Sequence, residues 1–217
     1  MIRQTFTTHI ARYAMLLLLA GCQGFNPVID TAGHFWAGKA QKDNFSPGFE
    51  YLEVEWQGRK AAMALGYRET KGARISEHWY NGQGEMIKLV NGRVVQVLGM
   101  TKEVRHAPGT PPVWADLLTH RSPVVWSQTK EVMPLYRYGL REFFLSQQST
   151  PAAADKAIAS EATAWVIEEV KSKNEKGTPW IYQQKFALLG DKVIYSEQCV
   201  SPEMCFKLRP LGVVVPK

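Results

Sequence analysis

The 217-residue chain lacks the sequence motifs of the common enzyme classes. It has no G-x-S-x-G nucleophile turn, no Walker phosphate loop, no H-E-x-x-H zinc motif and no dinucleotide fingerprint. The histidines after residue 21 are isolated from one another, so no spacing predicts a metal site. They are His34, His78, His106 and His120. The sequence therefore predicts a protein without metal or cofactor, and not an enzyme.

Clustered charge and long apolar runs are missing as well. The net charge is +6, but the Lys and Arg residues are scattered and form no patch suited to nucleic acid. The apolar run Met15–Ala20 is much shorter than the about 20 residues that a transmembrane helix needs. These absences argue against a nucleic-acid partner and against a membrane-spanning N-terminal helix.

The N-terminus instead has the pattern of a secretion signal. Arg3 and Arg12 precede the apolar run, and small residues precede Cys22. The letters LAGC, which end at Cys22, match the bacterial lipoprotein box. This match predicts a diacylglyceryl group on the Cys22 thiol, cleavage before Cys22, and a further acyl chain such as palmitate on the freed amine. The alternative is a buried N-terminal helix with a chance cysteine.

A lipid anchor of this kind determines where the mature protein resides. Each buried CH₂ contributes about 0.8 kcal/mol, so several acyl chains hold a protein firmly on a membrane. Gln23 follows the cysteine, whereas an Asp at that position usually keeps enterobacterial lipoproteins in the inner membrane. We therefore expect a signal peptide at 1–21, a tether at 22–44 and a β-rich periplasmic domain at 45–217. The expected location is the periplasmic face of the outer membrane.

Only three cysteines are present, and acylation of Cys22 leaves Cys199 and Cys205. The periplasm is oxidising, so a disulfide between them is the default expectation. The short loop containing Pro202 can bring the two Cα atoms within bridging range. A loop this short should stabilise the fold by less than the roughly 3 kcal/mol expected for 15 residues. A redox pair usually has C-x-x-C spacing at an electropositive helix start, and neither feature is present.

Alternating polar and apolar residues predict strands. Leu52, Val54 and Trp56 share one strand face, and 61–65 returns after a Gln57-Gly58 turn. A second hairpin surrounds Asn91-Gly92, a pair that suits both positive-φ positions of a type I′ turn.

Later segments continue this strand pattern. Strands are expected at 123–131, 135–148, 162–172, 179–190, 192–200 and 204–211. Short helical stretches are expected at 115–122 and 150–162. The proline-rich segment 105–114 is either a connection between two β subdomains or a long loop in one. The pattern predicts a mainly β fold, an antiparallel barrel or sandwich built from hairpins with little helix.

Two groups of side chains are candidates for contact with sugars. Glu53 and Glu55 share a strand face at roughly the 5–10 Å separation of glycosidase carboxylates, although a solvated strand face is the favoured interpretation. Aromatic rings stack on sugars, and Trp79, Tyr80 and Trp114 lie near predicted loops, which makes them candidates for a glycan-contacting surface. Three further tryptophans are in register with apolar strand neighbours and are expected in the core: Trp56, Trp126 and Trp165.

Four stretches together resemble the YjbF/GfcB family, the lipoproteins of group 4 capsule and related exopolysaccharide loci. They are the lipobox at Cys22, YLEVEWQGRKAAMALGY, GEMIKLVNGRVVQVLGM and WIYQQKFALLGDKVIYSEQCVSPEMCFKLRP. The resemblance implies a mainly β periplasmic body anchored at the outer membrane. It supports transfer of roles only to Cys22 and to the pair Cys199 and Cys205, and it supplies no catalytic residues.

The expected function is that of a non-enzymatic accessory in capsule or exopolysaccharide assembly or export. The expected partners are the outer membrane, through the lipid anchor, other polysaccharide-export proteins, and the polysaccharide itself. One alternative is a periplasmic glycan-modifying hydrolase whose carboxylates converge only in the folded chain. Another is a structural envelope lipoprotein that binds only proteins.

Overall fold

The computed structural model describes residues 45–213, apart from positions 47, 108, 120–121 and 175. The predicted signal peptide at 1–21, Cys22 and the predicted tether at 22–44 lie outside the described residues. The strands are, in chain order, β1 (Glu50–Trp56), β2 (Arg59–Lys71), β3 (Arg74–Tyr80), β4 (Met86–Val90), β5 (Arg93–Leu98), β6 (Glu103–His106), β7 (Val124–Met133), β8 (Arg137–Ser149), β9 (Ala164–Lys173), β10 (Pro179–Leu189), β11 (Lys192–Ser201) and β12 (Met204–Val213).

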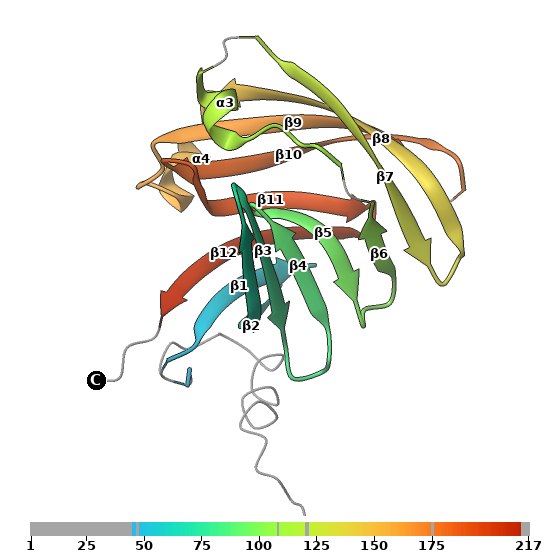
Figure 1. Ribbon diagram of the computed structural model, residues 1–217, viewed down its shortest axis with the longest axis horizontal. Coiled ribbons are helices and arrows are strands. Elements are labelled where there is room, and N and C mark those ends of the chain that lie inside the picture. The colour runs from blue at the N-terminus through green and yellow to red at the C-terminus, as the bar shows by residue number, and fades with distance from the viewer. Residues whose placement is uncertain (1–44, 47, 108, 120–121, 175, 214–217) are drawn as a thin grey trace, which may run out of the picture.

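The strands form one closed antiparallel barrel in which every strand pairs with its neighbour in sequence. Pairing of β1 with β12, in which Val54 lies opposite Leu208, closes the barrel. Closure leaves no open sheet edge, which is the usual solution to unpaired backbone groups in all-β folds. Figure 1 shows β7–β10 as one curved layer, with β11 beside β10 and β5 close to β11. The prediction of a hairpin-built antiparallel fold is confirmed, with the barrel as its form.

The predicted turn at Asn91-Gly92 is confirmed, with φ values of 48° and 78°. The turn joins β4 to β5, and the Asn91 side chain also connects it to the neighbouring β2–β3 turn. The Oδ1 atom of Asn91 accepts a hydrogen bond from the Ile75 amide, and its Nδ2 donates to the Ala73 carbonyl. A Cβ on Gly92 would lie 2.6 Å from a methyl group of Val193 on β11. Glycine is therefore required here both for its backbone angle and for its small size.

The apolar core fills the half of the barrel interior lined by β1–β6 and β12. Alternation along each strand directs every second side chain inward, as the hydrophobic pattern predicts. The predicted inward face of β1 is confirmed, because Leu52 and Val54 are buried in this core and Trp56 packs against it. Across the barrel, Met204, Phe206 and Leu208 of β12 pack into the same cluster.

Two short helices lie in strand connections at the same end of the barrel. Helix α3 (Trp114–Thr119) lies between β6 and β7, and α4 (Ala153–Ile158) between β8 and β9, as the two predicted helical stretches indicate. Trp114 and Leu117 of α3 pack against inward-facing Phe186 of β10, so α3 covers this end of the interior. The proline-rich segment thus connects neighbouring strands of the same barrel. Within the described ranges, no helix is long and apolar enough to cross a membrane.

Candidate functional site

Buried polar side chains gather in the half of the interior lined by β7–β11. Those shielded from solvent here are Arg93, Lys130, Glu142, Ser146, Glu168, Ser172, Gln184, Ser196 and Gln198. Removing a charge from water is costly unless an opposite charge and hydrogen bonds compensate it. Pairing among these groups therefore determines whether the cluster is structural or chemically available.

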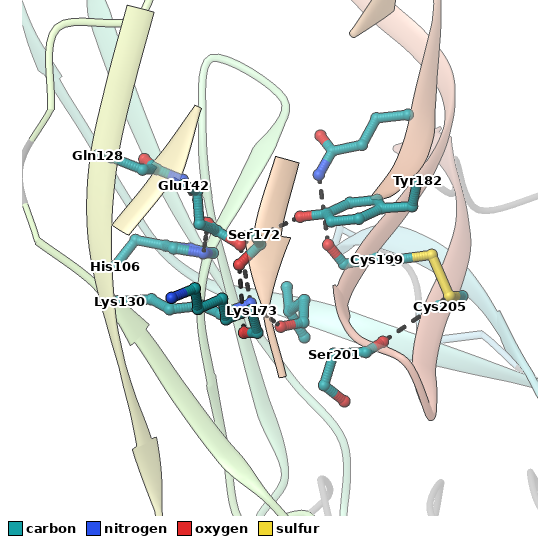
Figure 2. Close-up of polar contacts among 12 residues, drawn as sticks. His106, Gln128, Lys130, Glu142, Ser172, Lys173, Tyr182, Cys199, Ser201 and Cys205 are labelled. Atoms are coloured by element: carbon teal, nitrogen blue, oxygen red, sulfur yellow. Dashed lines mark hydrogen bonds and ion pairs between the residues drawn. A yellow bond between two sulfur atoms is a disulfide. The ribbon is translucent and has the colours of Figure 1, made fainter. Parts of the chain in front are cut away.

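Glu142 of β8 is at the centre of the first group. Its Oε1 lies 2.8 Å from Lys130 Nζ and accepts a hydrogen bond from the Tyr182 hydroxyl at 3.2 Å. Its Oε2 lies 3.0 Å from His106 Nε2, close enough for an ion pair when the imidazole is protonated, and accepts a hydrogen bond from Gln128 at 3.3 Å. Figure 2 shows these side chains converging on the carboxylate from β6, β7 and β10.

The surroundings of Glu142 keep it ionised. Burial alone raises the pKa of this carboxyl, but the contacts with His106 and the positive charge of Lys130 outweigh burial and hold the pKa at about 2. The pKa of Tyr182 moves the other way, well above its usual value, because of burial and the nearby Glu142 charge. Tyr182 is therefore a neutral hydrogen-bond donor, and Glu142 is a fixed anion.

Glu168 of β9 is at the centre of the second group. Its Oε1 accepts hydrogen bonds from Arg93 Nη2 at 2.8 Å, from Arg93 Nε at 3.2 Å and from Ser146 Oγ at 2.9 Å. The indole of Trp126 in turn donates to Ser146 Oγ. Because Arg93 is on β5, this ion pair links opposite walls of the barrel. The other oxygen, Oε2, has no hydrogen-bond partner among the described residues.

Aromatic rings enclose the Arg93 guanidinium. Its Cζ lies 3.5 Å from the centroid of the Trp114 ring, a cation–π contact, and Phe186 and Trp126 are each 5.7 Å away. The Trp114 indole donates a hydrogen bond to the Asn91 carbonyl at 2.7 Å. Trp114 therefore connects helix α3 both to the β4–β5 turn and to the buried ion pair.

Strand periodicity accounts for the convergence of these groups. Gln128 and Lys130 on β7, and Glu142 and Ser146 on β8, are separated by even numbers of residues and so face the same side. The register places Gln128 opposite Glu142. The inward stripe on these strands mixes polar and apolar residues, whereas on β1 it is apolar.

The buried charges are paired with one another and are closed off from large ligands. The Glu142 side chain is fully buried, and its partners Lys130 and His106 expose only 3% and 4% of their side chains. Lys130 also donates to the Val200 carbonyl of β11 at 2.7 Å. A depression beside this cluster, bordered by Lys130, Leu140 and Lys173, has no room for a water-sized sphere. This arrangement suits a rigid internal brace.

Two of the three aromatic residues predicted to contact glycan are buried in the structure. Trp79 and Trp114 are buried, with 2% and 3% exposure, and both pack in the core. Neither ring offers a face to a surface ligand. Tyr80, with 40% exposure, remains accessible at the end of β3.

The paired carboxylates lie on the outer face of β1, in the solvated arrangement that the sequence favours. Glu53 contacts Lys60 at 3.1 Å, and Glu55 contacts Lys207 at 3.1 Å. Each carboxylate is therefore matched by a lysine on a neighbouring strand.

The predicted disulfide is present. Cys199 and Cys205 lie directly opposite each other on β11 and β12 and are bonded. Cys205 is exposed and alternates with inward-facing Met204 and Phe206, so the bridge is on the outer surface.

The sequence interpretation missed the interior charges. A signal for them exists, because Lys130, Glu142 and Glu168 occupy positions that alternate in phase with buried apolar residues of the same strands. A charged residue in such a stripe requires a partner across the barrel. Naming that partner requires the closed topology, which single strands do not reveal.

Comparisons with known proteins agree with this architecture. The family model of the group 4 capsule polysaccharide lipoproteins GfcB and YjbF matches residues 49–207. Comparison with curated protein sequences gave no significant match. The crystal structure of the hypothetical lipoprotein YmcC from Escherichia coli (K12) is similar, with a TM-score of 0.55 and 14% identity, over 99% of this chain and 100% of that one. That likeness shows the fold alone. Because the family match spans most of the sequence, this chain belongs to the YjbF family of group 4 capsule polysaccharide lipoproteins.

Proposed function

We propose that this protein is an outer-membrane lipoprotein that acts as a non-enzymatic accessory in the assembly or export of capsule or exopolysaccharide. The observation that carries the proposal is the family match over residues 49–207. The lipobox at Cys22 supports the anchored state, and Gln23 supports sorting to the outer membrane. In this proposal the barrel faces the periplasm and works beside other polysaccharide-export proteins.

The interior of the barrel supports an accessory role. A catalytic acid or base must reach the atom to or from which it transfers a proton. Glu142, Lys130 and His106 are instead directed at one another and shielded from solvent. Glu53 and Glu55 are accessible, but they lie on an outer strand face where each contacts a lysine. The structure therefore favours a scaffold over the hydrolase alternative.

The proposal is tested in a strain that lacks the gene. Surface polysaccharide is measured after complementation with the wild type or with Cys22→Ala. We expect wild type to restore surface polymer, and we expect Cys22→Ala to fail because no acyl group can attach. Unchanged polymer in the deletion strain would overturn the proposed function.

Sorting can be tested without loss of the anchor. Gln23→Asp keeps the acylated cysteine but introduces the residue that retains enterobacterial lipoproteins in the inner membrane, and Gln23→Ser is its matched control. We expect membrane fractionation to move only the Asp variant to the inner membrane. Outer-membrane recovery of both variants would contradict the sorting prediction.

A further inference from the structure

A row of side chains crosses the outer face of the neighbouring strands β2 to β6, which Figure 1 shows in teal and green. The strand registers place its members directly opposite one another at every step. The residues next to them in sequence, such as Trp79, Val97 and Val104, are buried in the apolar core, so the row faces outward. We call the following residues the outer row: Tyr67, His78, Lys88, Gln96 and Arg105.

The outer row begins with aromatic rings. Tyr67 exposes 54% of its area, and its ring meets the His78 imidazole edge-on with 5.6 Å between the ring centroids. Tyr80, which is 40% exposed, lies two residues after His78 on β3 and therefore faces the same side of the sheet. The three rings thus lie on one outer face of the β2–β3 hairpin.

Gly66 provides the space in which the Tyr80 ring lies. A Cβ at position 66 would be 2.7 Å and 2.8 Å from two carbons of that ring. Glycine is often required for a positive φ, but Gly66 does not have one. The missing side chain at this position therefore serves the placement of the Tyr80 ring against β2.

The positive charges of the outer row are not balanced within it. Lys88 and Arg105 are cations, and none of the five residues is acidic. Burial and the nearby Lys88 charge lower the pKa of His78, so the imidazole adds no further charge at neutral pH. A second outer row, on the opposite flank of β1, has a carboxylate opposite every lysine. It consists of Lys60, Glu55, Lys207, Glu197 and Lys185.

The acidic residues at the border of the outer row leave its cations accessible to a ligand. Glu69 of β2 contacts Lys71 at 2.7 Å. Glu131 of β7 lies opposite Arg105, and no ion pair joins these two described residues. The row therefore presents two positive charges beside its aromatic end.

This combination of groups matches the chemistry of an acidic sugar polymer. Aromatic rings offer flat apolar faces on which the C–H faces of sugars stack, amide side chains bond to hydroxyls, and cations bind carboxylates. The steps from β2 to β6 span roughly 19 Å at about 4.8 Å between neighbouring strands. A row of that length on a convex wall suits an extended chain better than a single sugar. A stable protein interface would instead have an apolar centre depleted of charge.

We propose that the outer row, together with Tyr80, binds an acidic polysaccharide. The two tyrosine rings lie on its sugar faces, and Lys88 and Arg105 lie on its acidic groups. His78 and Gln96 form hydrogen bonds with the hydroxyls between them. This inference rests on the proposed function and specifies its partner.

Binding is tested by calorimetry with acylated full-length protein in detergent and three polymers of matched length. Polygalacturonate has both sugar rings and carboxylates, dextran has only sugar rings, and polyglutamate has only carboxylates. We expect polygalacturonate to bind most tightly, with an affinity that falls as salt rises. No binding of polygalacturonate, or equally tight binding of polyglutamate, would overturn the proposal.

Charge variants test the cations of the row. Lys88→Gln/Arg105→Gln should weaken the binding of polygalacturonate at least about tenfold, which corresponds to roughly 1.4 kcal/mol. The matched control, Arg141→Gln/Lys171→Gln, removes one arginine and one lysine from the outer faces of β8 and β9 and should leave the affinity unchanged. Equal losses in the two double variants would show a general attraction of charge and would contradict the assignment.

The ring position is tested without removing a ring. In Gly66→Ala the new methyl group displaces the exposed Tyr80 ring, so we expect its affinity to fall toward that of Tyr80→Ala, whereas Tyr80→Phe retains binding. Circular dichroism confirms that each variant is folded. Unchanged affinity in either alanine variant would overturn the ring contact.

Sedimentation of the same protein identifies a second copy as the occupant. A dimer that only Tyr67→Ala/Tyr80→Ala loses would assign the surface to self-association and overturn the proposal, whereas monomers in both cases support it. Failure of this inference is distinct from failure of the proposed function, since the deletion strain could still lose its surface polymer while the purified protein binds none.

Discussion

The carboxylate of Glu142 remains ionised inside the barrel because several strands supply its partners. Replacement by Gln removes the negative charge but leaves Lys130 buried beside a neutral amide. Breaking one half of a buried ion pair typically costs about 3–5 kcal/mol, so we expect Glu142→Gln to lower the free energy of unfolding by that order. Urea unfolding followed by circular dichroism measures this change.

An exposed pair gives the control for that experiment. Glu53→Gln removes a carboxylate that contacts Lys60 on the solvated face, where such pairs contribute about 0–1 kcal/mol. Similar losses of stability in the two variants would show that the interior ion pair contributes no more to stability than the exposed one.

The low pKa of Glu142 also predicts how stability depends on pH. The pKa is about 2 in the folded chain, compared with 4.5 for an unperturbed glutamate, so the folded state binds this proton less readily than the unfolded state does. The resulting stability is present above about pH 4.5 and is lost as the pH falls toward 2. Thermal unfolding between pH 6 and pH 2.5 should show a loss in wild type that is smaller in Glu142→Gln. Equal pH profiles would contradict this assignment.

At the scale of single elements, the β4–β5 turn combines a backbone requirement with a packing requirement. Gly92→Ala places a methyl group in a positive-φ position and against Val193. We expect a loss of roughly 2–5 kcal/mol, since the left-handed backbone costs about 1–2 kcal/mol and overpacking about 1–3 kcal/mol. Gly58→Ala in the β1–β2 turn is the matched control, because it has a φ of 73° and open space around the new methyl group. Equal losses of stability in the two variants would show that Val193 moves aside for the new methyl group at no cost in free energy.

The same turn shows how far the sequence predicts this fold. Asn-Gly between alternating runs indicates a hairpin through local physics alone, and the structure confirms it. The disulfide can likewise be predicted from the sequence, because Cys199 and Cys205 are close to each other along the chain. By contrast, Trp79 and Trp114 appear near loops in sequence, yet Trp79 is an inward strand residue and α3 folds Trp114 against the barrel core. Burial of this kind depends on contacts between distant segments, which periodicity does not specify.

At the scale of the whole molecule, contacts across the interior join the two walls of the barrel. Arg93 of β5 binds Glu168 of β9, and Lys130 of β7 binds the Val200 carbonyl of β11. Gln198 of β11 accepts a hydrogen bond from the Val94 amide and donates to the Gly92 carbonyl. The links of Arg93 and Gln198 join residues that precede the proline-rich segment 105–114 to residues that follow it, where the sequence left open a division into two subdomains.

Such links should make unfolding a single cooperative event. Tryptophan fluorescence reports on rings in both halves of the barrel, and far-ultraviolet circular dichroism reports on all strands. We expect the two signals to follow one urea transition with the same midpoint. In Glu168→Gln, which weakens the β5–β9 link, both midpoints should move together to lower urea, because neither wall keeps its packing once the other is lost. Two separated transitions in the wild type would mean that the segments before and after residue 110 fold independently. The buried ion pairs would then connect two domains that are each folded without the other.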